Sequence, residues 1–241
     1  MVDHRRSALR TAAVWAALQA ALDRRDGPSR VVDLGGGTGG FAVRLAESGH
    51  QVTVVDPSPD ALAALDRRAA EADVAGRVRG VQGDASDLAE LVGESSAELV
   101  LCHGVLEVVD DPAETLADSL RVLVPGGALS LLVAHRPAAV LARVLAGRLD
   151  QALELVREGS PTGPPRRFTE PEVLALLAEV GVEEGSEVHG VRVFADLVPG
   201  AVVDSEPGAA ELLLDLELCS ADHPELRTMA SQLHVLARRR R

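Results

Sequence analysis

A glycine-rich turn between two apolar segments is the part of the chain best suited to binding a ligand. Residues 31–34 are apolar except for Asp33, and five of the next six positions, 35–40, are glycine. A helix-like segment, 41–46, follows, so the order predicts a strand, a tight turn and a helix. Glycine allows positive φ and removes the Cβ atoms that would hold a ligand away. We therefore expect a nucleoside-type cofactor to lie against bare backbone here.

Two types of cofactor fit this turn, and a turn that binds nothing is the third reading. Gly35, Gly37 and Gly40 match the G-x-G-x-x-G pattern of dinucleotide sites, with Asp56 about 20 residues further on. That pattern alone is a weak signal. S-adenosylmethionine (SAM) is the other candidate, because its methyltransferases carry an acid two residues before the first glycine, here Asp33. SAM has a cationic amino-acid end that such an acid helps to hold.

Polar residues at the ends of the next strands favour SAM over a nicotinamide cofactor. Asp56 closes the second apolar segment, with Pro57 beside it, where its carboxylate can accept hydrogen bonds from ribose hydroxyls. Asp84 and Ala85 follow the third, where Asp84 can accept from the adenine amine. A Pro-Gly-Gly turn at 125–127 precedes a fifth strand. This order resembles the class I SAM-dependent methyltransferases.

Composition limits the class of protein. With 241 residues, 46% hydrophobic and 25% charged, the chain suits one α/β domain. We expect a leading helix at 4–25, a cofactor-binding half at 30–134 and substrate-side elements at 135–241. The net charge of −13 argues against a broad nucleic-acid surface. Cys102 and Cys219 are too few and too far apart to predict a metal site. No apolar stretch approaches the ~20 residues of a membrane span, so we expect a cytoplasmic protein with no membrane partner.

Alternating apolar and helical segments predict parallel βαβ units with helices on both faces of a sheet. The strands are expected at 30–34, 51–56, 77–82, 98–103, 127–134, 188–195 and 233–237. The helices after the leading one are expected at 39–48, 59–73, 86–92, 112–122, 137–158, 170–179 and 209–220. The methyltransferase resemblance implies a Rossmann-like α/β fold, with a seven-stranded, mostly parallel sheet in the order 3-2-1-4-5-7-6 and an antiparallel last strand.

A closer resemblance covers nearly the whole chain. Segments 102–112 and 122–131 look like the bacterial tRNA carboxymethoxyuridine methyltransferases, which methylate a modified wobble uridine. Segments 190–194, 213–217 and 234–238 extend the similarity towards the C-terminus. The family thereby implies a methyltransferase that uses SAM and releases S-adenosylhomocysteine (SAH).

The resemblance also implies roles for single residues. Arg10 would contact the SAM carboxylate, and Gly35 and Gly36 would line the methionine portion next to Gly37. Asp56 would bind the ribose, and Ala85 with Asp84 the adenine. His103 would form the floor of the site. No catalytic base is identified.

The chain departs from this family on the acceptor side. Residues 133–135 replace an aromatic pair and an asparagine, Leu197 replaces a tyrosine, and a basic stretch shrinks to Arg166 and Arg167. The acceptor therefore stays open between a modified tRNA and a small molecule that is methylated on oxygen or nitrogen. A module that binds SAM without turnover is a third hypothesis.

Two further side chains are candidates for contacting the substrate. His135, after the fifth strand, is expected either to contact the acceptor or to lie in a solvated turn. Arg192 is expected either to hold a carboxylate through two hydrogen bonds or to form a salt bridge on the sheet.

Asp56→Ala should weaken SAM binding by roughly 1.5–3 kcal/mol, because the ribose hydroxyls lose a charged acceptor. Isothermal titration calorimetry measures the change. Glu47→Ala, in the helix after the turn, should alter the affinity little. Equal losses in both variants would show that the second strand is misplaced.

Overall fold

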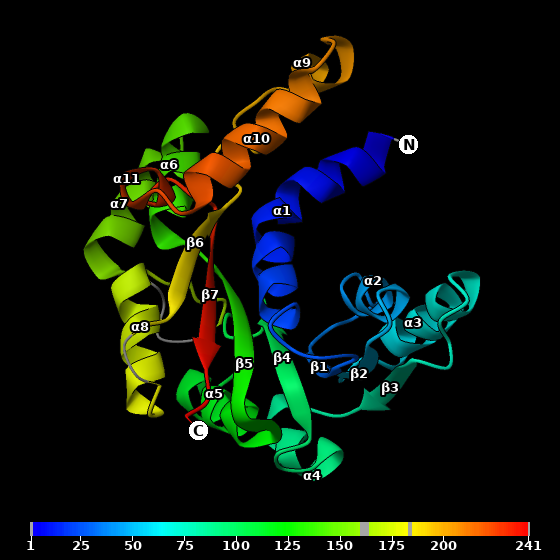
Figure 1. Ribbon diagram of the computed structural model, residues 1–241. Helices are drawn as coiled ribbons and strands as arrows, with labels where there is room; N and C mark the ends of the chain where they lie inside the picture. Colours follow the sequence, from blue (N-terminus) through cyan, green and yellow to red (C-terminus); the bar gives the residue numbers. More distant parts are fainter. Residues whose placement is uncertain (1, 160–163, 183–184, 241) are drawn as a thin grey trace.

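A twisted central sheet organises the protein, whose computed structural model describes residues 2–159, 164–182 and 185–240 (Figure 1). In these residues the sheet has seven strands in the order β3-β2-β1-β4-β5-β7-β6. β7 is antiparallel to β5 and β6, and the other neighbouring pairs are parallel. The predicted strand order and antiparallel last strand are confirmed. The strands are β1 (Arg30–Leu34), β2 (Gln51–Asp56), β3 (Val78–Gln82), β4 (Ala97–His103), β5 (Leu123–Ala134), β6 (Glu187–Val191) and β7 (Gln232–Arg238).

Helices cover both faces of the sheet (Figure 1). One face packs against α1, α2, α3 and the end of α10. The other packs against α4, α5 and α8. The helices are α1 (Val2–Leu22), α2 (Ala42–Glu47), α3 (Pro59–Glu71), η1 (Ala85–Asp87), α4 (Leu88–Val92), α5 (Pro112–Val122), α6 (Arg136–Leu145), α7 (Leu149–Glu158), α8 (Glu170–Glu179), α9 (Gly200–Ser205), α10 (Ala209–Ala221) and α11 (Pro224–Arg227). Among the described residues, no helix is long and apolar enough to cross a membrane.

The differences from the predicted elements have local causes. The helix predicted at 137–158 is two helices, because the chain turns at Gly147, whose φ is +73°. β6 ends at Val191 rather than at residue 195, because Arg192 takes a φ of +59° that a strand does not allow. The short α9 and α11 were not predicted, because they have too few residues for a helical periodicity.

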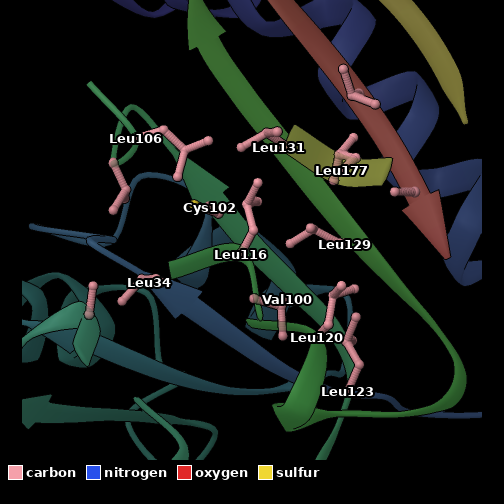
Figure 2. Packing of buried hydrophobic residues seen from close by; sticks show 14 of the residues in the cluster. Leu34, Val100, Cys102, Leu106, Leu116, Leu120, Leu123, Leu129, Leu131 and Leu177 are labelled. Atoms are coloured by element: carbon pink, nitrogen blue, oxygen red, sulfur yellow. The ribbon is translucent and has the colours of Figure 1, made fainter. Parts of the chain in front are cut away.

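The core consists mostly of Leu, Val and Ala, as expected for a chain with 2% aromatic residues. Figure 2 shows the cluster between the sheet and α5 and α8, in which Leu116, Leu129, Leu131 and Leu177 point toward one another. Each of these side chains is at most 1% exposed. This packing fixes the strands whose carboxyl ends carry the site.

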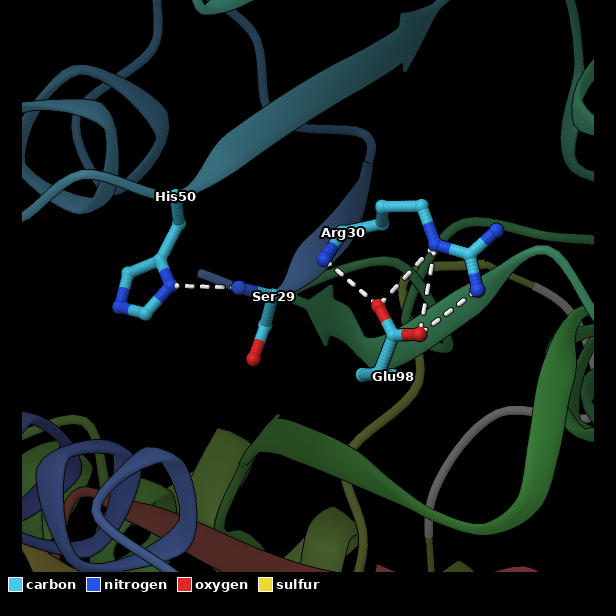
Figure 3. Close-up of polar contacts among 4 residues, drawn as sticks. All are labelled: Ser29, Arg30, His50 and Glu98. Atoms are coloured by element: carbon cyan, nitrogen blue, oxygen red, sulfur yellow. Dashed lines mark hydrogen bonds and ion pairs between the residues drawn. The ribbon is translucent and has the colours of Figure 1, made fainter. Parts of the chain in front are cut away.

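Polar contacts fix the beginning of β1 at the opposite edge (Figure 3). The Ser29 amide donates to Nδ1 of His50, just before β2, at 3.1 Å. The Arg30 amide donates to Oε2 of Glu98 in β4 at 2.6 Å, and its guanidinium pairs with Oε1 at 2.6 Å. These contacts tie β1 to both neighbours, so that the turn after its other end starts from a fixed position.

Leu129→Ala should lower the free energy of unfolding by about 2–5 kcal/mol, because it leaves a cavity in the core. Leu212→Ala, at a side chain that is 70% exposed, should change it by less than ~0.5 kcal/mol. Urea denaturation measures both. A small loss for Leu129→Ala would contradict this description of the core.

Candidate active site

A cavity of about 630 Å³ lies at the carboxyl ends of the first four strands. Ligands bind open α/β sheets at this edge, where the strand order reverses between β1 and β4. Six predicted cofactor residues line the cavity: Gly35, Asp56, Pro57, Asp84, Ala85 and His103. Residues that were not predicted complete its far wall at the start of α5, among them Asp110, Asp111 and Glu114.

Several positions of the turn after β1 leave no room for a Cβ, among them Gly35 and Gly36. Gly35 has a φ of +66°, and a Cβ there would lie 2.7 Å from Cγ2 of Val105. A Cβ on Gly36 would lie 2.5 Å from the carboxyl group of Asp33. A side chain at Gly35 would therefore collide with Val105, and one at Gly36 with Asp33. The bare backbone fits a cofactor that lies directly against it.

Asp56 joins this turn to the end of β2. Its Oδ2 accepts from the amide of Gly37 at 2.9 Å, and its Oδ1 accepts from the amide of Ser58 at 2.9 Å. Ser58 in turn caps α3 by accepting from the amide of Ala61. A carboxylate has about four acceptor positions, so lone pairs remain for ribose hydroxyls on the cavity side.

Asp33 lies buried beneath the turn and is 2% exposed. Burial, together with the nearby Asp56 carboxylate, raises the pKa of Asp33 to about 7. A cation bound close to the turn would stabilise its ionised form. Asp33 thus has the charge chemistry expected for the sulfonium and ammonium end of SAM.

Asp84 and Ala85, the predicted adenine-binding residues, lie just after β3. Oδ1 of Asp84 accepts from the Ala85 amide at 2.6 Å, which starts the short helix η1. Both residues line the cavity, and Ala85 is 6% exposed. The second carboxylate oxygen of Asp84 can accept from an amine.

His103 occupies the end of β4 at the boundary of the cavity. Its Nε2 lies 2.8 Å from Oγ of Ser130, and its Nδ1 is buried with no hydrogen-bond partner among the described residues. Burial lowers the pKa of His103 to about 3, so the ring is neutral at physiological pH. The Phe41 ring contacts it edge-on at 4.7 Å between centroids.

Six predicted residues are not among those that line this cavity: Asp33, Gly36 and Gly37, which belong to the turn region, and Arg10, Arg192 and His135, which lie elsewhere. Arg10 and Arg192 both pair with Asp196, at 3.4 Å to Oδ1 and 2.5 Å to Oδ2. Arg10 and Asp196 line a separate cavity of about 150 Å³. His135 is buried, and its Nδ1 lies 2.9 Å from the carbonyl oxygen of Ala230. The structure therefore brings the two arginines together, away from the walls of the large cavity.

Two acids that hold the segment 192–196 in place were not predicted from the sequence. Asp196 joins the two arginines and accepts from Oγ of Ser231 at 2.9 Å. Glu217 of α10 is 2% exposed and accepts from three successive backbone amides, those of residues 193–195. Nothing local marks either acid, because the four-residue spacing of Arg192 and Asp196 predicts a side-chain pair only in a helix, and residues 192–196 are not helical.

Comparisons with known proteins identify relatives of the chain. A family model described as a methyltransferase domain matches residues 32–131. The chain is 32% identical to the tRNA 5-carboxymethoxyuridine methyltransferase of Escherichia coli K12, over 96% of this chain and 88% of that protein. It is 29% identical to a ubiquinone biosynthesis O-methyltransferase of Ralstonia nicotianae, over 68% of this chain and 66% of that protein. A solved S-adenosylmethionine dependent methyltransferase from Mesorhizobium loti superposes with a TM-score of 0.61 at 26% identity, over 96% of this chain and 100% of that chain.

Gly36→Ala should weaken SAM binding at least about tenfold, because the added methyl pushes the Asp33 carboxyl out of its place. Gly40→Ala is the matched control, because a Cβ there meets nothing within 4 Å. Calorimetric titration compares the two variants. Similar affinities would contradict the described geometry of this turn.

Asp33→Asn should flatten the pH dependence of stability. The carboxyl ionises near pH 4 in the unfolded chain but near 7 in the native one. Its contribution to the free energy of unfolding is therefore full below about pH 4 and is lost as pH rises to 7. The amide of the variant does not ionise. Between pH 5 and 7.5 the free energy of unfolding of the variant should therefore rise by on the order of a few kcal/mol relative to that of the unsubstituted protein. Urea denaturation at several pH values checks this. Parallel pH profiles would contradict the raised pKa.

Proposed function

The chain belongs to the SAM-dependent methyltransferases, in the family that includes the E. coli tRNA 5-carboxymethoxyuridine methyltransferase, and we propose that it methylates the carboxylate of a carboxymethoxy group on a modified tRNA wobble uridine. The similarity over 96% of the chain carries this proposal, because it continues beyond β5 into the segments that would meet the acceptor. A match confined to the cofactor half would support methyl transfer alone.

We propose that SAM occupies the large cavity. Its methionine portion would lie over Gly35 and Gly36, its ribose against Asp56 and Pro57, and its adenine beside Asp84 and Ala85. The glycine positions that exclude a Cβ and the spare acceptor positions of Asp56 support this arrangement. Arg10 would have to exchange its partner Asp196 for the SAM carboxylate.

The chemistry asks little of the protein beyond alignment. SAM supplies an activated methyl group on its sulfonium, so the chain has to orient the acceptor in line and exclude water. A carboxylate acceptor is ionised at neutral pH and needs no general base. Arg192, which holds one carboxylate now, is suited to hold the acceptor carboxylate in its place.

A small-molecule acceptor is the second candidate, favoured by the charge of the chain. Its net charge of −13 opposes a polyanion. Arg166 of the reduced basic stretch donates to the carbonyl oxygens of Val109 and Asp110. The Arg166 guanidinium therefore binds the backbone of the cavity wall.

Incubation with isotopically labelled SAM, tRNA and a metabolite extract distinguishes the candidates. Mass spectrometry of digested tRNA should show the label as a methyl ester on a modified uridine, and Gly36→Ala should reduce the labelling when SAM is not saturating. Label only in a small metabolite would overturn the tRNA proposal. No label anywhere, from a protein that binds SAM, would support the module without turnover.

Arg192→Ala should raise KM for the carboxylate acceptor roughly tenfold or more while SAM affinity stays nearly unchanged, because one charged hydrogen-bonding group is lost. Arg67→Ala, at an exposed arginine of α3, is the control. With tRNA as acceptor, affinity should also fall steeply with added salt, whereas a small acceptor gives a shallow slope. A steep salt dependence together with no effect of Arg192→Ala would contradict the proposal that Arg192 binds the acceptor carboxylate.

A further inference from the structure

A line of polar side chains crosses the sheet from the cavity to the surface. Nε2 of His103 and Nε2 of His234 each lie 2.8 Å from Oγ of Ser130. Nδ1 of His234 lies 3.2 Å from Nδ1 of His189. Nε2 of His189 lies 3.4 Å from Oδ1 of Asp222, after α10. The four members in the sheet come from β4, β5, β7 and β6, which are adjacent strands.

Most of this line is buried. Ser130 and His234 are 0% exposed, and the His189 side chain is 14% exposed, whereas that of Asp222 is 77% exposed. Polar groups in a core cost free energy unless they are hydrogen-bonded. Apolar residues would fill the same space without that requirement, so stability alone does not account for the line.

The Asp222 charge and one proton per ring together set the direction of the three hydrogen bonds among the sheet residues. Burial lowers the pKa of all three histidines, so each ring is neutral and carries one N–H. The Asp222 carboxylate lies 3.4 Å from Nε2 of His189, and its negative charge favours a proton on that nitrogen. His189 then accepts at Nδ1 from His234, which accepts at Nε2 from the Ser130 hydroxyl. Ser130 accepts in turn from Nε2–H of His103.

These hydrogen-bond directions determine whether Nδ1 of His103, at the cavity end of the line, carries a proton. With its proton on Nε2, His103 has a bare lone pair at Nδ1, the buried nitrogen that lacks a partner among the described residues. The Phe41 ring, stacked on Trp15 at 5.0 Å between centroids, holds the imidazole in place. An unpaired buried acceptor calls for a donor.

We propose that Ser130, His234, His189 and Asp222 are positioning residues that fix the tautomer of His103, so that its Nδ1 accepts a hydrogen bond from an N–H or O–H group bound at the cavity. The donor is the ammonium of the SAM methionine portion or a protonated group of the acceptor. This role rests on the assignment of the cavity to SAM, and it is independent of which acceptor is methylated.

Nitrogen NMR of histidine-labelled protein without cofactor reads the tautomer directly. His103 should be protonated at Nε2 and bare at Nδ1, and Ser130→Ala should give a mixture of tautomers. Ser119→Ala is the matched control, because Ser119 is equally buried but donates to a carbonyl within α5. Asp222→Ala, at the exposed end, tests the line without disturbing the core, with Glu225→Ala at the separate His223 pair as control. A protonated Nδ1, or a tautomer that neither Ser130→Ala nor Asp222→Ala changes, would overturn the proposal.

Binding experiments identify the donor. If it is the ammonium, Ser130→Ala should weaken SAH binding roughly three- to tenfold and leave an SAH analogue without the amino group unaffected. If it is a group of the acceptor, SAH affinity should stay constant while kcat falls. No change in either quantity would overturn the proposal. Failure of methyl transfer to tRNA would leave the tautomer and SAH results standing, so the two proposals fail separately.

Discussion

The two hydrogen bonds that Asp56 accepts from Gly37 and Ser58 are the constraint on which the site depends. They join the glycine turn after β1 to the end of β2, while the Gly35 amide donates to the carbonyl oxygen of Val55 at 2.8 Å. The turn therefore cannot move independently of the acid that would bind ribose. The register of β1 and β2, fixed by the polar contacts at their other ends, sets this geometry.

Two buried polar groups, Asp33 and His103, lie close to the place where the cofactor would bind. The charge state of each suits part of that cofactor. Asp33 keeps a carboxyl group beneath the turn with a pKa raised to about 7, ready to ionise beside a cation. His103 stays neutral and offers a lone pair. His103, with its pKa lowered to about 3, is a weak base, and Asp33 is not among the residues that line the cavity.

The strand order was predicted from the methyltransferase resemblance. Local patterns in the sequence were enough to predict the strands, the turn and the acids at the strand ends. Each of these features rests on an apolar run closed by an acid or glycine within a few residues. Long-range partners leave no such pattern. Arg10 and Asp196 are brought together by the packing of α1 beside β6, and Ser130 and His234 by the register of β5 and β7. The tertiary fold therefore decides the partners of Arg10, Arg192 and His135, which sequence spacing does not.

Isothermal titration calorimetry of the unsubstituted protein with SAM, and separately with NADH, tests most directly whether this cavity is built for SAM. We expect SAM to bind at micromolar concentrations or below, about −8 kcal/mol or better, and NADH to give no binding heat. Micromolar binding of NADH together with no binding of SAM would contradict the assignment.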